Sequence, residues 1–508
     1  MGADLVLGID SSTTATKAIA WTADGRPMAE GRAPVPMAEV RPGWFEQGVE
    51  DWWRSLARAL RALFAQIEPS RIAALAITNQ RETIGFLDRG GEELRPAILW
   101  LDERCREDVE LLAARVGAGR FREITGKTPD ITPAIFAAHW VRRHEPERWA
   151  KLGALVDVHG YLVWRLTGER RTSWASADPH GFLDIATKRY HPELLAALGI
   201  DAAQLFTPER PGALLGRVGA EAARETGLLA GTPVFAGGGD GQAAGLGAGV
   251  LAPGRAYLNL GTAAVSGVYG RAPRTDRAFR TLTALDGEGY IYELCLRTGA
   301  FLTDWMVQRV FGLDPAGDPD CYRRLEAEAA AIPPGADGLL LLPYWSGVMA
   351  PHWNPDACGA IVGLRVEHRR GHLYRALMEG IALDLAAGYR DIEEAIGETV
   401  EELTLLGGGA RSGLWRQIIA DASGRPAALS ATIEATCLGA AMLAAHGAGF
   451  HATLAEAAGS MAGRVEERQL PGAAAEVYAA LLESYRALYP ALEGMFLRLA
   501  ALRREVGR

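Results

Sequence analysis

The chain has 508 residues, which is more than one hydrophobic core usually organises, so we expect two domains with a cleft between them. Acidic residues outnumber basic residues by 62 to 53, giving a net charge of -9, and lysines and arginines form no stripe that could follow a phosphate backbone. A nucleic-acid partner is therefore not expected. The five cysteines are scattered without CxxC spacing, which predicts neither a disulfide framework nor a zinc site and favours the reducing cytoplasm.

The first elements of the chain predict a strand, a hairpin and a second strand. Residues 5–10 are an apolar run that ends in a carboxylate, and residues 17–22 are strand-like and lead into a turn. Neither a basic region nor a long apolar region precedes the first strand, so no signal peptide is expected. A helix is predicted from about residue 51, because apolar residues recur there at spacings of three and four.

Later strands each run into a loop rich in glycine or polar residues. Residues 72–78 are apolar and β-branched and lead into Asn79-Gln80-Arg81-Glu82, a position in which α/β proteins often place their chemistry. The same pattern recurs for residues 232–236, 256–260 and 403–406, whose loops are Gly237 to Gly241, Gly261-Thr262 and Gly407 to Gly409. Helical segments such as residues 373–396 alternate with these strands, which favours an α/β fold.

The similar strand-and-turn openings of the two halves suggest that the chain is duplicated. Small residues and Pro253 cluster near residues 247–254, so we place the boundary there and predict an N-terminal domain, 1–250, and a C-terminal domain, 251–508. Residues 473–502 are rich in alanine and leucine and predict a pair of packing helices. Asp240 interrupts the most glycine-rich apolar stretch, and a charge is costly in lipid, so no membrane-spanning segment is expected.

The glycine-bearing loops are suited to phosphate binding. Glycine lacks a Cβ atom and permits positive φ, so backbone N–H groups can approach phosphate oxygens closely. The hydroxyls of Thr13, Thr14 and Thr262 and the nearby Lys17 add donors that suit a triphosphate. One such loop alone is explained as a tight turn, whereas three of them, two with carboxylates, favour nucleotide binding. The sequence GxxxxGK[ST] does not occur, so a P-loop is not the explanation.

Two carboxylates, Asp10 and Asp240, end apolar strands, where an unpaired charge is costly unless a cation or hydrogen bonds compensate. Phosphoryl transfer needs one group that holds Mg²⁺ and another that accepts the proton of the attacking hydroxyl, and two aspartates can fill both roles. Taken singly, Asp10 is equally explained as a cap or turn acceptor and Asp240 as a β-turn residue. Their pairing favours a kinase site with both carboxylates near the metal.

These motifs resemble those of the FGGY carbohydrate kinases over most of the chain. The family has a two-domain fold like those of actin and hexokinase, built from a duplicated ribonuclease H-like unit with a cleft between the domains. Gly8-Ile9-Asp10-Ser11-Ser12-Thr13-Thr14 is similar to its first phosphate loop, Gly238-Gly239-Asp240 to its second and Gly407-Gly408-Gly409-Ala410-Arg411-Ser412 to its adenosine loop. Residues 359–379 are similar to its C-terminal signature.

The resemblance implies ATP and Mg²⁺ as cofactors, Asp240 as the catalytic base and Asp10 as a residue that helps to order the magnesium. It implies nucleotide contacts from Thr13, Thr14, Lys17, Gly261, Thr262, Gly408, Gly409, Ala410 and Ser412. The chain departs from the family pattern at Ser12, where a glycine is usual, and at Ala137, where a lysine usually stands three places before the tryptophan, here Trp140.

The acceptor is suggested by two further resemblances. Residues 78–83 are similar to the glycerol-binding segment of glycerol kinases, in which the arginine and glutamate, here Arg81 and Glu82, bind neighbouring hydroxyls. An exposed ion pair after a strand is the alternative explanation. Trp100 matches a substrate-facing tryptophan of the same kinases. Residues 140–146 and 409–417 are instead similar to xylulokinases.

Two small residues indicate room for an acceptor longer than glycerol. Gly241 stands where glycerol kinases have glutamine and xylulokinases have asparagine, and Thr132 replaces a tyrosine of the glycerol pocket. Both changes remove bulk. The predicted acceptor-binding residues are Arg81, Glu82, Trp100, Thr132 and Asp240.

We therefore predict an ATP-dependent kinase that phosphorylates a hydroxyl of a small sugar or polyol, with D-xylulose as the best single choice of acceptor. Glycerol or another four- to five-carbon polyol or ketose is the alternative acceptor. A catalytically idle sugar or nucleotide sensor is the alternative of another class. The sugar or polyol and ATP are the expected partners, neither nucleic acid nor membrane is expected, and a homodimer is left open.

Overall fold

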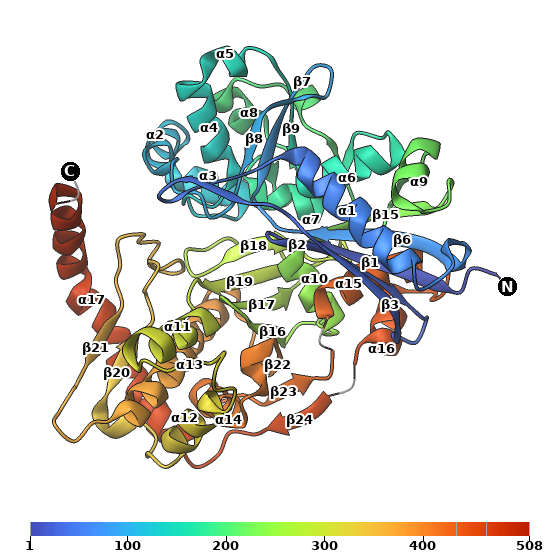
Figure 1. Cartoon of the computed structure of the whole chain (residues 1–508). Coiled ribbons are helices and arrows are strands. Elements are labelled where there is room, and N and C mark those ends of the chain that lie inside the picture. The colour runs from blue at the N-terminus through green and yellow to red at the C-terminus, as the bar shows by residue number, and fades with distance from the viewer. Residues whose placement is uncertain (1, 433, 464, 507–508) are drawn as a thin grey trace.

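Two mixed β-sheets with the same pattern of parallel and antiparallel strands form the centres of the two halves of the chain (Figure 1). The computed structural model describes residues 2–432, 434–463 and 465–506. The first sheet has the order β14-β15-β6-β1-β2-β3, and the second has β24-β23-β22-β16-β17-β19 with β18 added at its edge. In each sheet three adjacent strands are parallel and the strands on either side of them are antiparallel. This repetition confirms the predicted α/β fold with two similar halves.

The strands of these sheets have the following bounds. The first sheet contains β1 (Leu5–Ser11), β2 (Ala15–Trp21), β3 (Pro27–Pro34), β6 (Ile72–Asn79), β14 (Leu214–Arg217) and β15 (Pro233–Gly239). The second contains β16 (Arg255–Leu260), β17 (Ala264–Gly270), β18 (Arg280–Thr283), β19 (Tyr290–Leu296), β22 (Glu402–Leu406), β23 (Ala427–Ser430) and β24 (Val465–Gln469). A five-stranded sheet inserted in the first half contains β4 (Ala38–Arg41), β5 (Trp44–Gln47), β7 (Ile84–Asp88), β8 (Glu93–Ile98) and β9 (Leu152–Asp157). The strands predicted from the sequence are β1, β2, β6, β15, β16 and β22.

Helices cover these sheets and connect their strands. Those of the first half include α1 (Val49–Phe64), α2 (Arg106–Val116), α3 (Ala118–Thr125), α4 (Ala134–His144), α6 (Val158–Thr167), α7 (Trp174–Ala177) and α10 (Asp240–Gly247). Those of the second half include α11 (Ala300–Trp305), α12 (Cys321–Ala330), α13 (Arg370–Ile396), α14 (Gly413–Ser423), α15 (Ala435–Gly447), α16 (Leu454–Met461) and α17 (Ala475–Val506).

Helix α1 shows why the predicted amphipathic helix forms where it does. Its apolar residues recur every three or four positions, and Trp52, Leu56 and Leu60 are fully buried against the first sheet. Two acidic residues lie in its first turn, where the helix dipole favours negative charge. A Cβ atom at Gly31 of β3 would lie 1.9 Å from the Ala59 carbonyl oxygen, so glycine is what allows the helix to pack this closely.

Helices α10 and α15 pack against each other between the two sheets, although they belong to different halves of the chain (Figure 1). A Cβ atom at Gly439 of α15 would lie 2.1 Å from the Ala243 carbonyl oxygen of α10. A Cβ atom at Gly8 of β1 would lie 1.8 Å from the carbonyl oxygen of Cys437 of α15. The glycines therefore let α15, from the second half, lie directly on the first sheet. The division at residue 250 stays a prediction.

The C-terminal segment differs from the prediction of a pair of helices. It forms one helix, α17 (Figure 1), and Pro490 lies inside this helix. Proline in a helix removes a backbone hydrogen bond. The helix continues because one apolar face is buried against the second core on both sides of the proline, at Tyr478, Leu482, Tyr485, Tyr489 and Phe496. In the described part of the chain, no helix combines the length and apolarity needed to cross a membrane.

Candidate active site

A cavity of about 440 Å³ lies between the two halves of the chain and gathers most of the predicted site residues. The first half contributes loops that follow β1 and β6, the start of α10, residues that follow β8 and residues that precede α4. The second half contributes residues of β18 and β19 and the β16–β17 turn. The predicted residues that line this cavity are Asp10, Thr13, Arg81, Glu82, Trp100, Thr132, Asp240, Gly261 and Thr262. A cavity of this volume is typical of a small-molecule site.

Asp10 lies near the end of β1, opposite Thr78 of the parallel strand β6. Its Oδ1 atom is buried and has no hydrogen-bond partner, which is costly for a polar atom. Burial and the nearby charge of Asp240 raise the pKa of Asp10 to about 8. Asp10 therefore does not act as a cap or turn acceptor, and the charge of Lys17, which opposes the shift, does not outweigh burial and Asp240.

Asp240 is placed by the passage from strand β15 to helix α10, of which it is the first residue. Its Oδ1 atom accepts a hydrogen bond from the Gly241 amide at 2.7 Å and lies 3.1 Å from Arg81 Nε. The side chain opens into the cavity with 41% of its surface accessible. Desolvation by the surrounding protein raises the pKa of Asp240 above its usual range even though the charge of Arg81 opposes the shift.

Arg81 and Glu82 are buried, and each pairs with a residue of the second half rather than with the other. Arg81 Nη1 donates to Glu293 Oε2 at 2.6 Å, and Arg280 Nη1 donates to Glu82 Oε1 at 2.9 Å. The alternative of an exposed ion pair is therefore wrong. Glu82 has a φ of 59°, a left-handed conformation that is unusual for glutamate and is found most often where function requires it.

Trp100 and Thr132 form another part of the cavity wall. The Trp100 indole Nε1 donates to Thr13 Oγ1 at 3.0 Å and therefore joins the acceptor side of the cavity to the first phosphate loop. Thr132 Oγ1 donates to Asp130 Oδ2 at 2.7 Å, and the same oxygen accepts from Arg297 Nη2 at 2.8 Å. Arg297 also lines the cavity, so the wall near Thr132 is polar.

The predicted nucleotide loops lie at the ends of strands of the second sheet. Gly261 and Thr262 form the turn between β16 and β17, and their carbonyl oxygens accept hydrogen bonds from the amides of Ala300 and Gly299. Gly407 has a φ of 85°, and a Cβ atom there would lie 2.5 Å from Asn259 Oδ1, so this loop packs against the end of β16.

The rest of the predicted adenosine loop lies outside the lining of the cavity. Gly408 is exposed with open space where a Cβ atom would be, and Gly409 packs against Leu260 and Trp415. The Ala410 side chain is fully buried, so only its backbone could reach a ligand. The Ser412 hydroxyl accepts from the Trp415 amide and caps helix α14, and it donates to Glu326 at 2.7 Å.

Thr14 and Lys17 are the other predicted residues that do not line the cavity. Thr14 is exposed at the β1–β2 turn. Lys17 Nζ donates to Glu434 at 2.6 Å and lies 3.8 Å from Glu30, so its charge is already balanced by carboxylates. Lys17 thus links β2 to the residue that precedes α15.

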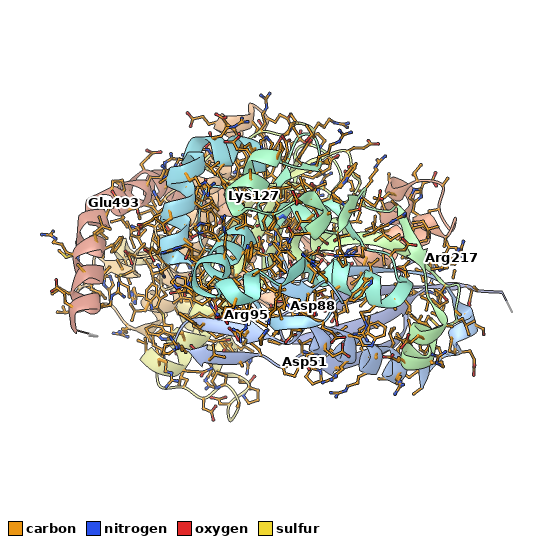
Figure 2. All side chains as sticks on the ribbon, turned by 90° about the horizontal axis from the view of Figure 1, so that it is seen from above. Asp51, Asp88, Arg95, Lys127, Arg217 and Glu493 are labelled. Atoms are coloured by element: carbon orange, nitrogen blue, oxygen red, sulfur yellow. The ribbon has the colours of Figure 1, made fainter. Side chains whose placement is uncertain are left out.

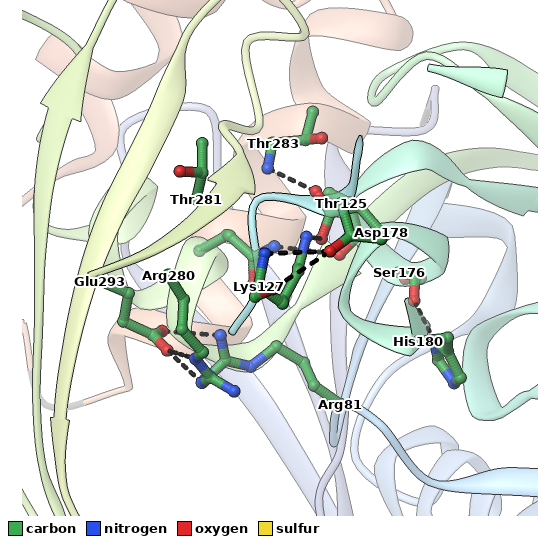
Figure 3. A network of polar contacts seen from close by, with 12 residues as sticks. Arg81, Thr125, Lys127, Ser176, Asp178, His180, Arg280, Thr281, Thr283 and Glu293 are labelled. Carbon is green, nitrogen blue, oxygen red and sulfur yellow. Dashed lines mark hydrogen bonds and ion pairs between the residues drawn. The ribbon is translucent and has the colours of Figure 1, made fainter. Parts of the chain in front are cut away.

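Arg280 and Glu293 were not predicted from the sequence. Arg280 lines the cavity, and the buried Glu293 next to it accepts a hydrogen bond from Arg280 (Figure 3). Glu293 is the one charged residue in the otherwise apolar and aromatic strand Tyr290–Leu296. This isolated charge is the sequence signal from which a functional role of Glu293 could have been predicted. Its side chain has no accessible surface and pairs with both Arg81 and Arg280. Burial alone would raise the pKa of Glu293, but the charges of Arg280 and Arg81 outweigh it and lower that pKa.

A buried lysine lies next to this network. Lys127 is 1% exposed, and Figure 2 shows it within the molecule, in contrast to Glu493 on the surface of α17. Its Nζ lies 3.5 Å from Asp178 Oδ1, and burial lowers the pKa of Lys127. The other Asp178 oxygen accepts from the Thr283 amide of β18, so this pair joins the first half to the strand that carries Arg280 (Figure 3).

A second cavity, of about 240 Å³, lies behind β19 and is lined mainly by α13, α17 and residues 344–352. Its polar groups include Asp384, which accepts hydrogen bonds from the hydroxyls of Tyr344 and Tyr485. None of the predicted site residues lines it, so we assign the active site to the larger cavity between the halves.

Comparison with known proteins agrees with this geometry. The chain is 34% identical to the xylulose kinase of Escherichia coli over 431 residues, which cover 83% of this chain and 85% of that protein. It is 33% identical to a glycerol kinase of Alkalilimnicola ehrlichii over 459 residues, which cover 88% of this chain and 90% of that protein. The crystal structure of a xylulose kinase from Rhodospirillum rubrum matches with a TM-score of 0.90 at 31% identity, covering 97% of this chain and 99% of that one.

Two family models together cover most of the sequence. The N-terminal domain of the FGGY family of carbohydrate kinases matches residues 5–247, and the C-terminal domain of the same family matches residues 256–448. The match confirms the resemblance found in the motifs of the sequence and the expectation of an enzyme that transfers a phosphoryl group to a carbohydrate. The chain belongs to the FGGY family of carbohydrate kinases.

Proposed function

We propose that the protein transfers the γ-phosphoryl group of ATP to a terminal hydroxyl of a ketopentose, with D-xylulose as the first acceptor to test. The observation that carries this proposal is a single cavity lined by Asp240, by Arg81 and Glu82, and by the Gly261-Thr262 turn. A base, a polar acceptor site and a phosphate-binding loop are the parts that this reaction needs. The similarity to two xylulose kinases supports the choice of acceptor.

Asp240 takes the proton of the attacking hydroxyl. Its Oδ1 atom accepts from the Gly241 amide and lies near Arg81, which leaves Oδ2 available for the acceptor. Arg81 holds the carboxylate in a fixed direction, as a positioned base requires. A general base works best when its pKa is near the operating pH, and burial shifts the pKa of Asp240 in that direction.

Asp10 fits a role beside a magnesium ion. Its buried Oδ1 atom lacks a partner, and a cation would supply the missing compensation. In the part of the chain that the structure describes, no group of three or more His, Cys, Asp and Glu side chains is arranged to hold a metal ion. This suits Mg²⁺, which usually binds one or two carboxylates together with phosphate oxygens and water. Asp10 and Asp240 would hold it, and the bound ion would neutralise charge on the transferred phosphate.

The loops that carry Thr13 and Thr262 face the cavity from opposite halves. Thr13 and Thr262 both line it, and both follow corresponding strands of the two sheets, β1 and β16. Their hydroxyls and the adjacent amides would donate to the phosphate chain of ATP, and the Gly407 to Ser412 loop would lie beside the nucleoside. Closure of the two halves over ATP would protect the γ-phosphate from water, a smaller competing acceptor.

The proposal is tested by ADP release from purified protein with MgATP and a panel of acceptors that contains D-xylulose, other ketoses, four- and five-carbon polyols and glycerol. We expect ADP release that depends on the acceptor and a higher kcat/KM for a ketopentose than for glycerol. ADP release that does not depend on any acceptor would instead indicate an ATPase, and none at all would indicate a sensor.

Glycerol is the second candidate acceptor. Arg81 and Glu82 line the cavity in the segment that resembles glycerol kinases, and a glycerol kinase is 33% identical to the chain. We further propose that the enzyme works in the cytoplasm, where ATP and Mg²⁺ are abundant. Light scattering of the purified protein in solution would decide between a monomer and a homodimer.

A further inference from the structure

Arg280 brings a second guanidinium group to the acceptor side of the cavity from the opposite half of the chain. It lies on β18, whereas Arg81 and Glu82 follow β6, and all three line the cavity. Arg280 Nη1 donates to Glu82 Oε1, and its Nη2 and Nε both donate to Glu293 Oε1. A guanidinium has five N–H donors, and these bonds use three of them. Two N–H donors, one on each terminal nitrogen, therefore remain for a ligand.

Glu293 holds the two guanidinium groups side by side. Its Oε2 atom accepts from Arg81 and its Oε1 atom accepts from Arg280, and its side chain has no accessible surface. Because it is fully buried behind the two arginines, it cannot touch an acceptor directly. A buried carboxylate shared by two arginines fixes the direction of both forks, since both would lose a partner if either moved.

Gly241 leaves the space that this arrangement needs. A Cβ atom at this position would lie 3.1 Å from Glu293 Oε2 and 3.2 Å from Arg81 Nη2, which is tighter than ordinary van der Waals contact. The glycine is therefore explained by packing against the Arg81–Glu293 pair. Residue 241 therefore lacks the amide side chain that glycerol kinases and xylulokinases have at this position. Arg280 offers hydrogen-bond donors on the same side of the cavity.

The strand that carries Arg280 is fixed against the first half. The Thr281 amide donates to the Gly126 carbonyl oxygen at 2.8 Å, and the Thr283 amide donates to the carboxylate of Asp178 (Figure 3). A Cβ atom at Gly126 would lie 2.7 Å from the Thr281 side chain, so this contact is close. Both bonds are made by residues that follow Arg280 in β18, so they fix the strand that carries its side chain.

We propose that Arg280 is an acceptor-binding residue that recognises hydroxyls beyond the vicinal pair held by Arg81 and Glu82, and that Glu293 is the positioning residue for both arginines. The class of acceptor is then a ketose or polyol of four or five carbons. Glycerol has three hydroxyls, so when one faces Asp240 and the other two bind Arg81 and Glu82, none is left for Arg280. The inference rests on the proposed function and adds to it the residue that selects acceptor length.

The test compares kcat/KM for the best long acceptor of the panel with kcat/KM for glycerol. Arg280→Lys keeps the positive charge but cannot bridge Glu82 and Glu293, so we expect the ratio of the two values to fall about tenfold, the equivalent of one lost hydrogen bond. Glu293→Gln should lower the ratio in the same direction, and the KM for ATP should change less than twofold in both. Arg498→Lys, on the exposed part of α17, is the matched control and should keep the ratio of the wild type.

Gly241→Gln provides a second test that keeps both arginines. Its side chain would displace Arg81 from Glu293, and we expect the preference for the long acceptor over glycerol to fall. A purely structural role of the network would lower activity on both acceptors equally and leave the ratio unchanged. An unchanged ratio in Arg280→Lys, Glu293→Gln and Gly241→Gln would overturn the inference and leave the kinase function intact. A wild type that prefers glycerol would do the same. A wild type that forms no ADP with any acceptor overturns both.

Discussion

The buried carboxylate of Asp10 should make the metal-free protein less stable as the pH rises, and Asp10→Asn should remove this effect. In the unfolded chain Asp10 loses its proton near pH 4, the ordinary value for an aspartate. In the folded protein, burial and the charge of Asp240 raise the pKa of Asp10 to about 8. Between these values the folded protein holds one proton more than the unfolded chain, so the free energy of unfolding falls with rising pH.

The size of the effect follows from the shift of the pKa. Each pH unit inside this window changes the free energy of unfolding by about 1.4 kcal/mol. From pH 5.5 to pH 7.5 the wild type should therefore lose about 2.7 kcal/mol more than Asp10→Asn. The difference between the two proteins should stop growing above about pH 8, where Asp10 is ionised in both the folded and the unfolded state.

Urea unfolding followed by tryptophan fluorescence measures this difference, with EDTA present and without nucleotide. Glu68→Gln removes an exposed carboxylate of the first half and serves as the control, whose pH profile should run parallel to that of the wild type. Parallel profiles of the wild type and Asp10→Asn would show that Asp10 is ionised at neutral pH in the folded protein. The reasoning from its unpartnered oxygen would then be refuted.

Three further results are expected. Asp240→Asn should lower kcat by at least about 10²-fold because the base is lost. Its affinity for MgADP, measured by calorimetry, should stay within twofold of the wild type. Near-normal turnover would exclude Asp240 as the base. A protonated Asp240 cannot accept a proton, and burial raises the pKa of Asp240. The kcat/KM of the wild type should therefore fall as the pH drops, with a midpoint above pH 4. A profile that is still flat at pH 4 would contradict this expectation. Thr132→Tyr should lower kcat/KM for a ketopentose about tenfold relative to glycerol, because a larger ring narrows the cavity; equal losses would place Thr132 outside the acceptor site.

Local patterns explain why much of the fold could be predicted. Apolar runs that end in glycine or carboxylate correspond to β1, β6, β15, β16 and β22, because strand formation and turn chemistry depend on neighbouring residues. The C-terminal helix was not predicted as one element. Its continuation through Pro490 depends on the apolar contacts of Tyr485 and Tyr489 with the second core, which lie outside any local window.

The α/β class, the loops at the strand ends and the carboxylates Asp10 and Asp240 could be predicted from the sequence, and the cavity brings these carboxylates together with Arg81 and Glu82. Which other side chains complete that site depends on the tertiary structure. Glu293 meets Arg81 across 212 positions of the chain, and Arg280 meets Glu82 across 198. No local signal carries such a pairing, because it depends on how two sheets from different halves pack together, and that packing is the sum of many distant contacts.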